Sequence, residues 1–499
     1  MDNIVVITQN VKLESLAKLR EYIIPGSETV VFSTQLIFEN EVPVIEDALD
    51  SKCKFVSFGD FMTDRDYESC DIMAYDDRSP NSSVYFDDIK RLKNRLLVTR
   101  LLEKYPCENK LIVCDDLGIE EDDWLPFGFK KVRCEYYFNR PIMRGNRITV
   151  FLRKFNSLIK LIKNFYNSTI YQTNIEGQEY RFHGSLNRIA YRMEPKFGIC
   201  SKAENRRYIR YFFLNLFFHY VPEDNIIHLS TLHEAGAWRF PDDPRFKLKL
   251  IQDGYLPPNY SSKYLRYYER NAEFYSWDVE GGRTFEMHHL SHRILPFRKK
   301  LYLPVPRYPN KVTKVLCVAS GAGDWTAVKS RSDEDKMLQV FGRIAKRFPE
   351  IDFVYRCHPV WVNPDFQGVN SINRAAEYIS WLDLPNLRIS SNIPNANEDG
   401  KFRFSYKRSS FEEDLNGVDI VFGEHSISQI DAAFKNILFC SVNVTGRRDL
   451  FAGITEMGFP HCESEEEIAQ LLTNLTTDTF KKSYEQAIDN YNKMTDKEA

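Results

Sequence analysis

Short apolar runs alternate with helix-like segments in two separate blocks of the chain, and this alternation constrains the fold more than any other feature. In the first block, IVVIT, VVFST, KFVSFGDF and LIVCDD are strand-like, with helix-like segments between them. In the second block, VTKVLCVAS, IDFVYRC, NLRISS, VDIVFGE and ILFCSVNV follow the same rhythm. Strands that alternate with helices form parallel sheets covered by helices. The sequence therefore predicts an α/β fold with two parallel sheets.

The chain length favours two domains, because 499 residues exceed what one ordinary core organises. Residues 1–300 would form a first Rossmann-like domain and residues 301–499 a second one, joined by the proline-rich segment PFRKKLYLPVPRYPNK at 296–311. An insertion over about 135–300, aromatic, basic and partly helical, would belong to the first domain. Two such domains would face each other across a cleft, with ligands at the carboxyl ends of the strands.

Charge and cysteine usage restrict the class of protein. The formal net charge is only −3, which argues against broad binding of nucleic acid. The ten cysteines include no CxxC pair, and the N-terminus lacks the blocks of an export signal, so we expect a reduced, cytoplasmic protein. No apolar run reaches the ~18 residues that span a bilayer. The basic amphipathic segment 149–166 would either pack on a neighbouring domain or lie on the inner face of an anionic membrane.

Three loops of the second block should emerge at the same edge of the sheet. They are SGAGDW at 320–325, CHPVW at 357–361 and GEHSIS at 423–428. Glycine backbone, a donor side chain and free helix amides are what a phosphate-bearing ligand needs. Gly321, Gly323, His358 and either Ser426 or Ser428 are therefore candidate phosphate-binding residues. Pro359 would hold the turn that presents the histidine.

A strand ending in His-Pro, followed 68 residues later by a serine-bearing loop at a helix start, resembles the donor half of bacterial GT-B glycosyltransferases that use CMP-activated sugars. The resemblance covers about the last 190 residues and is closest in layout to the retaining Kdo transferases of capsule and lipopolysaccharide assembly. It implies that His358, Pro359, Ser426 and Ser428 hold the CMP moiety, with Glu424 at the ribose hydroxyls. In similar sialyltransferases the hydroxyl residues are usually adjacent, whereas Ile427 separates them here.

Acidic residues near the expected strand ends are candidates for catalysis. The resemblance to retaining Kdo transferases suggests Asp324 as the nucleophile of a double displacement, although the residue could equally form an Asx turn or cap a helix. In the first domain, STLHEAGAWRFPDD and LIQDGYLPP supply His233, Glu234 and Asp253 as candidate general acids or bases, with Asp253 preferred.

Metal and cofactor signals are weak in this sequence. EMHHLSH carries three histidines but no HExxH frame, so we interpret it as structural. DED at 333–335 is better explained as a helix start than as a metal motif, and DRD at 64–66 lies in an unsuitable architecture. The similar CMP-sugar enzymes act without a metal, and no cofactor is expected beyond the CMP-sugar substrate.

The sequence thus predicts a glycosyltransferase that moves a sugar, with Kdo favoured, from a CMP donor to a bacterial surface polysaccharide or glycolipid. An inverting sialyltransferase and a teichoic-type enzyme that transfers an alditol phosphate from a CDP donor would keep the same phosphate loops. A catalytically silent GT-B module that scaffolds a polysaccharide assembly complex is the alternative from another class.

Overall fold

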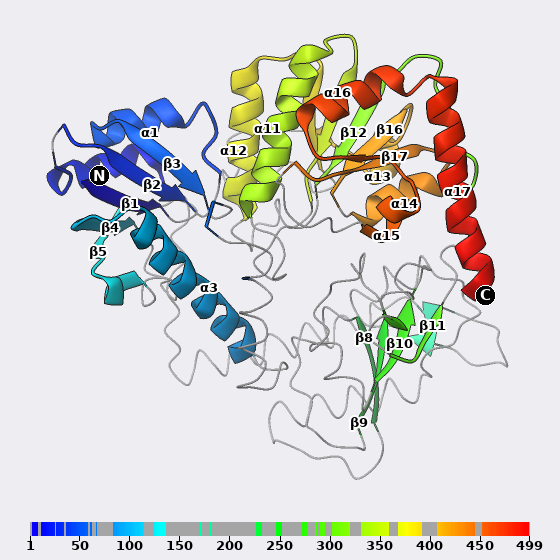
Figure 1. Ribbon diagram of the computed structural model, residues 1–499, viewed down its shortest axis with the longest axis horizontal. Helices are drawn as coiled ribbons and strands as arrows, with labels where there is room; N and C mark the ends of the chain where they lie inside the picture. The colour runs from blue at the N-terminus through cyan, green and yellow to red at the C-terminus, as the bar shows by residue number, and fades with distance from the viewer. Residues whose placement is uncertain are drawn as a thin grey trace.

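The computed structural model (Figure 1) describes residues 2–7, 11–24, 26–33, 36–57, 60–61, 66, 83–113, 124–135, 170–171, 180–181, 226–231, 246–251, 272–276, 285–286, 290–294, 302–319, 331–358, 368–391, 407–424, 426–444 and 452–498.

The first sheet has five parallel strands in the order β3-β2-β1-β4-β5 (Figure 1). Its elements are β1 (Asn3–Ile7), the 3₁₀ helix η1 (Leu13–Glu21), β2 (Thr29–Ser33), α1 (Val42–Leu49), β3 (Cys53–Ser57), α3 (Ser83–Lys104), β4 (Asn109–Val113), the 3₁₀ helix η3 (Leu125–Phe127) and β5 (Lys130–Val132). Alternate residues of β1 enter different cores: Val6 packs with α3, and Val5 packs with η1 and α1. Burial on both faces explains why β1 is apolar from Ile4 to Ile7.

The second sheet has seven parallel strands in the order β15-β14-β13-β12-β16-β17-β18 (Figure 1). Its elements are β12 (Lys314–Val318), α11 (Arg331–Arg347), β13 (Asp352–Arg356), α12 (Gly368–Leu382), β14 (Leu387–Ser391), β15 (Lys407–Arg408), α13 (Phe411–Asp414), β16 (Ile420–Gly423), α14 (Ile427–Ala433), β17 (Leu438–Val442), α15 (Ala452–Glu456), β18 (His461–Cys462), α16 (Glu465–Asn474) and α17 (Asp478–Glu498). The chain places β13, β14 and β15 on one side of β12 and then returns to place β16, β17 and β18 on the other.

Between these sheets in sequence lies a third, middle sheet with the order β11-β10-β9-β8, all parallel. Its strands are β8 (Ile226–Thr231), β9 (Phe246–Ile251), β10 (Ala272–Ser276) and β11 (His292–Ile294), and a separate ribbon pairs β6 (Ile170–Tyr171) with β7 (Tyr180–Arg181). The apolar segments NIIHLSTL and FKLKLIQDGYL are strand candidates by their sequence, and β8 and β9 confirm them. The amphipathic segment 149–166 lies outside the described residues.

The fold class is α/β, and the first and second sheets are parallel and flanked by helices, as the alternating pattern predicted. The parallel middle sheet is additional to the two sheets that the pattern predicted. Three details differ from expectation. The sequence suggests Ser332 as the N-cap of a helix, but α11 begins at Arg331, so Ser332 lies inside it. Helices α1 and α12 had no counterpart in the sequence interpretation. The segment ESEEEIAQLLTNL at 463–475 suggests a helix that closes the fold. It corresponds to α16, but the 21-residue helix α17 follows it.

The described part of the proline-rich segment is packed against the second sheet's helices. Leu303 is buried, and its backbone exchanges two hydrogen bonds with the side chain of Asn492 in α17. The backbone amide of Arg307 donates to the carbonyl of Asn436, which follows α14, at 2.8 Å. Residues 302–311 are therefore anchored at several points. Among the described helices, none is both long and apolar enough to cross a membrane.

Candidate functional site at the carboxyl edge of the second sheet

The carboxyl ends of the central strands of the second sheet lie level with one another. Val318 at the end of β12 pairs in register with Arg356 of β13 on one side and with Gly423 of β16 on the other. The backbone amide of Ala319 also donates to the carbonyl of Arg356 at 3.0 Å. His358 therefore follows a strand end adjacent to β12, and Glu424 follows the strand end on its opposite side.

The edge between β12 and β16 is the point at which the strand order reverses. The connection from β12 runs to β13, whereas β16 is reached only after β15 and α13. At such a reversal point, the loops that follow the two neighbouring strands run in opposite directions. A crevice then opens outside the carboxyl ends of the strands, and ligands of α/β proteins bind there. Glu424 begins the loop after β16 and is 9% exposed, and His358 is half-buried after β13.

Gln429 braces the backbone around Glu424. Its side chain is fully buried, and its amide nitrogen donates to the carbonyls of Gly423 in β16 and Cys440 in β17, each at 3.0 Å. Its amide oxygen accepts from the backbone amide of Ser426 at 2.8 Å. A β-carbon on Gly423 would come within 2.8 Å of that oxygen, so only glycine lets Gln429 approach this strand end.

Ser426 is the N-cap of α14. Its hydroxyl accepts a hydrogen bond from the backbone amide of Ser428 at 3.3 Å, and with Gln429 it forms a capping box. The spacing of Ser426 and Ser428, with Ile427 between them, is thus the spacing of a cap and the first turn of its helix. Both hydroxyls lie in half-buried residues at the carboxyl edge.

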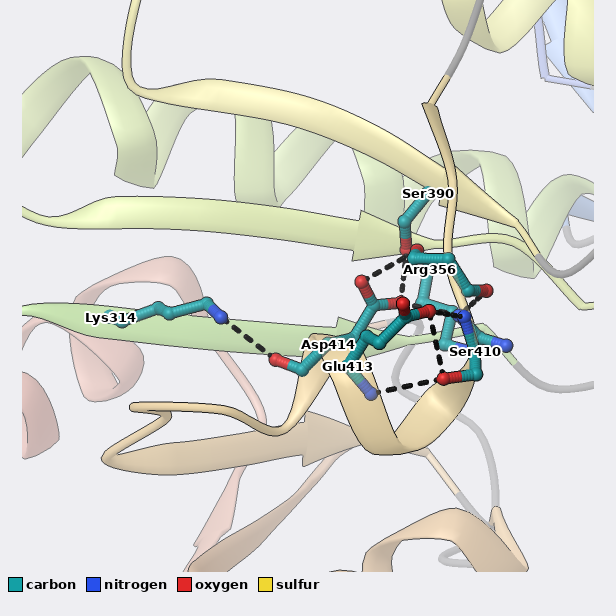
Figure 2. Close-up of polar contacts among 7 residues, drawn as sticks. Lys314, Arg356, Ser390, Ser410, Glu413 and Asp414 are labelled. Atoms are coloured by element: carbon teal, nitrogen blue, oxygen red, sulfur yellow. Dashed lines mark hydrogen bonds and ion pairs between the residues drawn. The ribbon is translucent and has the colours of Figure 1, made fainter.

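A buried polar cluster anchors the end of β13, two residues before His358 (Figure 2). The guanidinium of Arg356 forms an ion pair with Asp414 of α13, and Ser390 and Ser409 donate to the same carboxylate at 2.7 Å each. The ammonium of Lys314 donates to the carbonyl of Asp414 at 2.9 Å. These contacts join three strands to α13, and the cluster is a positioning device that the sequence interpretation missed. The available signal was an arginine at the end of an apolar strand run, IDFVYRC.

Several predicted site residues lie outside the described residues: Gly321, Gly323, Asp324, Pro359, His233, Glu234 and Asp253. The strands that lead to them are described. His233 and Glu234 follow β8, and Asp253 follows β9. These two strands end in register, with Thr231 opposite Ile251. The carboxyl ends of β8 and β9 therefore lie side by side.

Two motifs considered for metal binding have structural partners instead. Asp66, the last residue of DRD, forms a two-pronged ion pair with Arg100 of α3, with one contact of 2.7 Å. Asp335, the last residue of DED, is buried and contacts Arg374 of α12 rather than serving only a helix start. His292, the last residue of EMHHLSH, is the first residue of β11. Within the described ranges, no group of three His, Cys, Asp or Glu side chains is arranged to hold a metal ion.

Comparisons with known proteins do not assign a family. No protein-family model matches the sequence, and a search of curated proteins found no match. Among solved structures, UDP-GlcNAc 2-epimerase from Neisseria meningitidis bound to UDP-GlcNAc is 10% identical at a TM-score of 0.23, covering 100% of this chain and 99% of that chain. TarM is 9% identical at a TM-score of 0.35, covering 100% and 98%. Anabaena Alr3699/HepE in complex with UDP and glucose is 9% identical at 0.31, covering 100% and 95%. TM-scores this low establish neither a shared fold nor a shared activity.

Proposed function

We propose that this chain is a metal-independent, GT-B-type glycosyltransferase that takes a sugar from a CMP-activated donor. Kdo is the favoured sugar, and a bacterial surface polysaccharide or glycolipid is the acceptor. The observation that carries the proposal is the reversal point between β12 and β16, with His358 and Glu424 at the strand ends that flank β12. In this proposal the donor binds within residues 301–499, and the acceptor binds within residues 1–300 across a cleft.

His358 and Glu424 have side chains that suit the phosphate and the ribose of a nucleoside monophosphate, respectively. An imidazole at a strand end can donate a hydrogen bond to a phosphate oxygen, and the Arg356–Asp414 cluster fixes the strand that presents it. The carboxylate of Glu424 can accept from ribose hydroxyls, and the Gln429 brace fixes its backbone. Ser426 and Ser428 would complete the phosphate contacts.

The proposed reaction is a double displacement. A carboxylate oxygen of Asp324 attacks the anomeric carbon, and the bond to the phosphate oxygen breaks with its electron pair leaving on CMP. The acceptor hydroxyl then attacks the same carbon, breaks the bond to Asp324, and gives its proton to a general base of the first 300 residues, for which Asp253 is preferred over Glu234 and His233. His358 compensates the charge on the departing phosphate, which a metal ion would otherwise do.

The location that we propose is the cytoplasm, with peripheral contact at the inner face of the membrane through the basic segment 149–166. This placement would bring the enzyme to a growing glycolipid or polysaccharide acceptor. Flotation with vesicles that contain anionic lipid, compared with neutral vesicles, tests this part separately from donor binding.

Calorimetric titration with CMP, with UMP, GMP and ADP as controls, tests the donor site. We expect selective CMP binding that weakens about 10- to 100-fold in His358→Ala, the range for losing a hydrogen bond to a charged group. Arg388→Ala is the matched control, because Arg388 pairs with Asp352 at the exposed, opposite end of β13. Binding that ignores His358 would reject the donor assignment and favour the silent scaffold.

Product analysis then separates the remaining enzymatic alternatives. CMP-Kdo, CMP-sialic acid and a CDP-alditol are offered in turn to the same preparation. Loss of turnover in Asp324→Asn with CMP binding retained supports the double displacement. Full turnover in that variant, with loss in Asp253→Asn, points to an inverting enzyme with a single base.

A further inference from the structure

A loop of the first sheet is inserted into the helices of the second sheet. This docking loop, residues 36–41, follows β2 and precedes α1, and it reaches α11 and α12 (Figure 1). Phe38 is 1% exposed and belongs to the hydrophobic core of the second sheet, not to either core of the first. Its ring stacks on Tyr378 of α12, with centroids 4.6 Å apart and planes 12° apart. The first sheet thus contributes an aromatic side chain to the core of the second.

A buried ion pair lies directly beside this stacked pair. The guanidinium of Arg374 in α12 holds the carboxylate of Glu41 with two hydrogen bonds, of 2.7 Å and 2.6 Å. It also contacts Asp335 of α11 at 3.4 Å and donates to the carbonyl of Leu36 at 2.5 Å. The side chains of Arg374, Glu41 and Asp335 are 8%, 6% and 3% exposed. One arginine therefore joins the docking loop to both helices away from solvent.

The guanidinium of Arg374 lies between two carboxylates, those of Glu41 and Asp335. Burial acts to lower the pKa of Arg374, but the charges and hydrogen bonds of Glu41 and Asp335 outweigh it and raise that pKa, so the guanidinium stays protonated. The Glu41 carboxylate also accepts from the backbone amide of Phe38 at 2.9 Å. The Arg374 guanidinium lies 5.0 Å from the Phe38 ring centroid, at cation–π distance. Removing the Arg374 guanidinium should be strongly destabilising, because it leaves the buried carboxylates of Glu41 and Asp335 without this counter-ion.

The two helices that receive the loop are themselves tightly packed. A β-carbon on Gly342 of α11 would come within 2.6 Å of Leu382 of α12, so these helices cross closely at that point. The next residue, Arg343, approaches Glu39 of the docking loop at 3.6 Å and pairs with Glu465 of α16 at 2.6 Å. The loop is therefore held on a rigid helix pair by contacts on more than one side.

We propose that the docking loop, together with Asp335, Arg374 and Tyr378, is a fixed pivot that makes the two sheets fold as one cooperative unit and confines their relative motion to rotation about this contact. Contacts between domains of one chain are usually polar and permit motion. This one combines a shared core residue, a stacked aromatic pair and a two-pronged buried ion pair. The inference does not depend on any assignment of activity.

Calorimetric unfolding of the full chain tests the cooperativity. The wild-type protein should unfold in one transition that includes both sheets, and Phe38→Ala should split it into two. Arg388→Ala, which breaks an exposed ion pair within the second sheet, should keep one transition. Two transitions in the wild-type protein, or one transition in Phe38→Ala, would overturn the proposal. If Phe38→Ala does not fold, Glu41→Gln takes its place, because glutamine keeps the shape of the glutamate side chain. Two transitions in Glu41→Gln would then support the proposal, and one transition would overturn it.

Hydrogen exchange measured by mass spectrometry gives an independent readout. Glu41→Gln should accelerate exchange in both α1 and α12 at least 10-fold. Acceleration confined to residues 36–41 would show that the loop is only a local contact. A Glu41→Gln, Arg374→Met double variant should exchange no faster than the more affected single variant, because both changes remove the same interaction. Additive acceleration would contradict the pairing.

Discussion

A methyl group at position 423 has no room, because it would meet both Gln429 and Val318 at 2.8 Å. The absence of a side chain there lets three backbone segments meet through one buried amide: the end of β16, the middle of β17 and the start of α14. Glu424, the candidate ribose ligand, is the next residue. The position of that carboxylate therefore depends on its glycine neighbour.

Gly423→Ala should destabilise the protein by about 1–3 kcal/mol, the usual cost of overpacking a filled site. It should also weaken CMP binding, because the shifted strand end carries Glu424. Gly26→Ala is the control: its β-carbon meets open space, but its φ of +72° costs about 1–2 kcal/mol through backbone strain. Urea unfolding and CMP titration measure both effects. Equal CMP affinity in the two variants would show that the brace does not position the donor site.

Tyr378 should make stability depend on alkaline pH. Burial, assisted by the charge of Glu39, raises the pKa of its phenol above the ordinary 10.0. Above pH 10 the unfolded chain loses this proton while the folded chain keeps it, so the free energy of unfolding falls as pH rises. The slope from one such group is up to about 1.4 kcal/mol per pH unit. Urea unfolding between pH 8 and 11 should show a shallower decline for Tyr378→Phe than for wild type. Tyr302→Phe, at an exposed tyrosine, is the control and should lose stability with pH as steeply as wild type. An equally steep loss in Tyr378→Phe would contradict the assignment of this pH dependence to Tyr378.

The positions of His358 and Glu424 beside strand ends could be predicted from the sequence, because each follows an apolar run and the end of such a run is visible in the local pattern. The role of Arg374 could not be predicted, because its partner Glu41 lies 333 residues away and the sequence around either residue gives no sign of the ion pair. Asp335 gave a partial signal, since it precedes Leu338 by three residues on the buried face of α11. An acid on an apolar helical stripe predicts a buried partner but does not identify it.

At the level of elements, the strands of both main sheets were the most predictable parts. Strands buried on both faces are continuous apolar runs, and such runs stand out in sequence. Helix α12, GVNSINRAAEYISWL, was missed because Asn373 and Arg374 interrupt its apolar face, and both are buried in the fold. Helix α17 was missed because its apolar residues are spread over a long polar segment. Tertiary contacts, more than local pattern, specify these two helices.

Tyr484 links α17 to the second sheet and supplies a test of that helix. Its buried hydroxyl accepts a hydrogen bond from the backbone amide of Phe439 in β17 at 3.0 Å, and its ring packs edge-on against Phe459. Tyr484→Phe leaves a buried amide without this acceptor and should cost about 1–3 kcal/mol. Tyr22→Phe, at a half-exposed tyrosine, should cost less than about 0.5 kcal/mol. Denaturant unfolding compares them, and a neutral Tyr484→Phe would mean that α17 is held by apolar packing alone.

At the scale of the whole molecule, the contacts that form the candidate donor site differ from the contacts that join the two sheets. The candidate donor site is built by strands and loops of the second sheet, whereas the pivot joins that sheet to the first through α11 and α12. Donor binding and alignment of the two halves should therefore respond to different substitutions.

Phe38→Ala should lower kcat about 10- to 100-fold while changing the Kd for CMP by less than about threefold. Misalignment of reacting groups that are held by different halves of an enzyme costs turnover at this scale, whereas donor contacts stay within one half. His358→Ala should show the reverse pattern, with the Kd for CMP raised. Steady-state kinetics and calorimetry on the same preparations separate the two effects. Equal losses of CMP affinity in both variants would mean that the halves share the donor site.

The distance along the chain between Glu41 and Arg374 also matters before the protein is complete. Glu41 and Arg374 are 333 residues apart in the chain. At translation rates of about 5–20 residues per second, roughly 17–67 s therefore pass between the synthesis of the two residues. Throughout that interval Phe38 has no core to enter and Glu41 has no counter-ion. During synthesis, the docking loop of the first sheet therefore stays exposed with an apolar ring and a negative charge. We expect chaperones to bind this loop, or neighbouring nascent chains to misassemble through it.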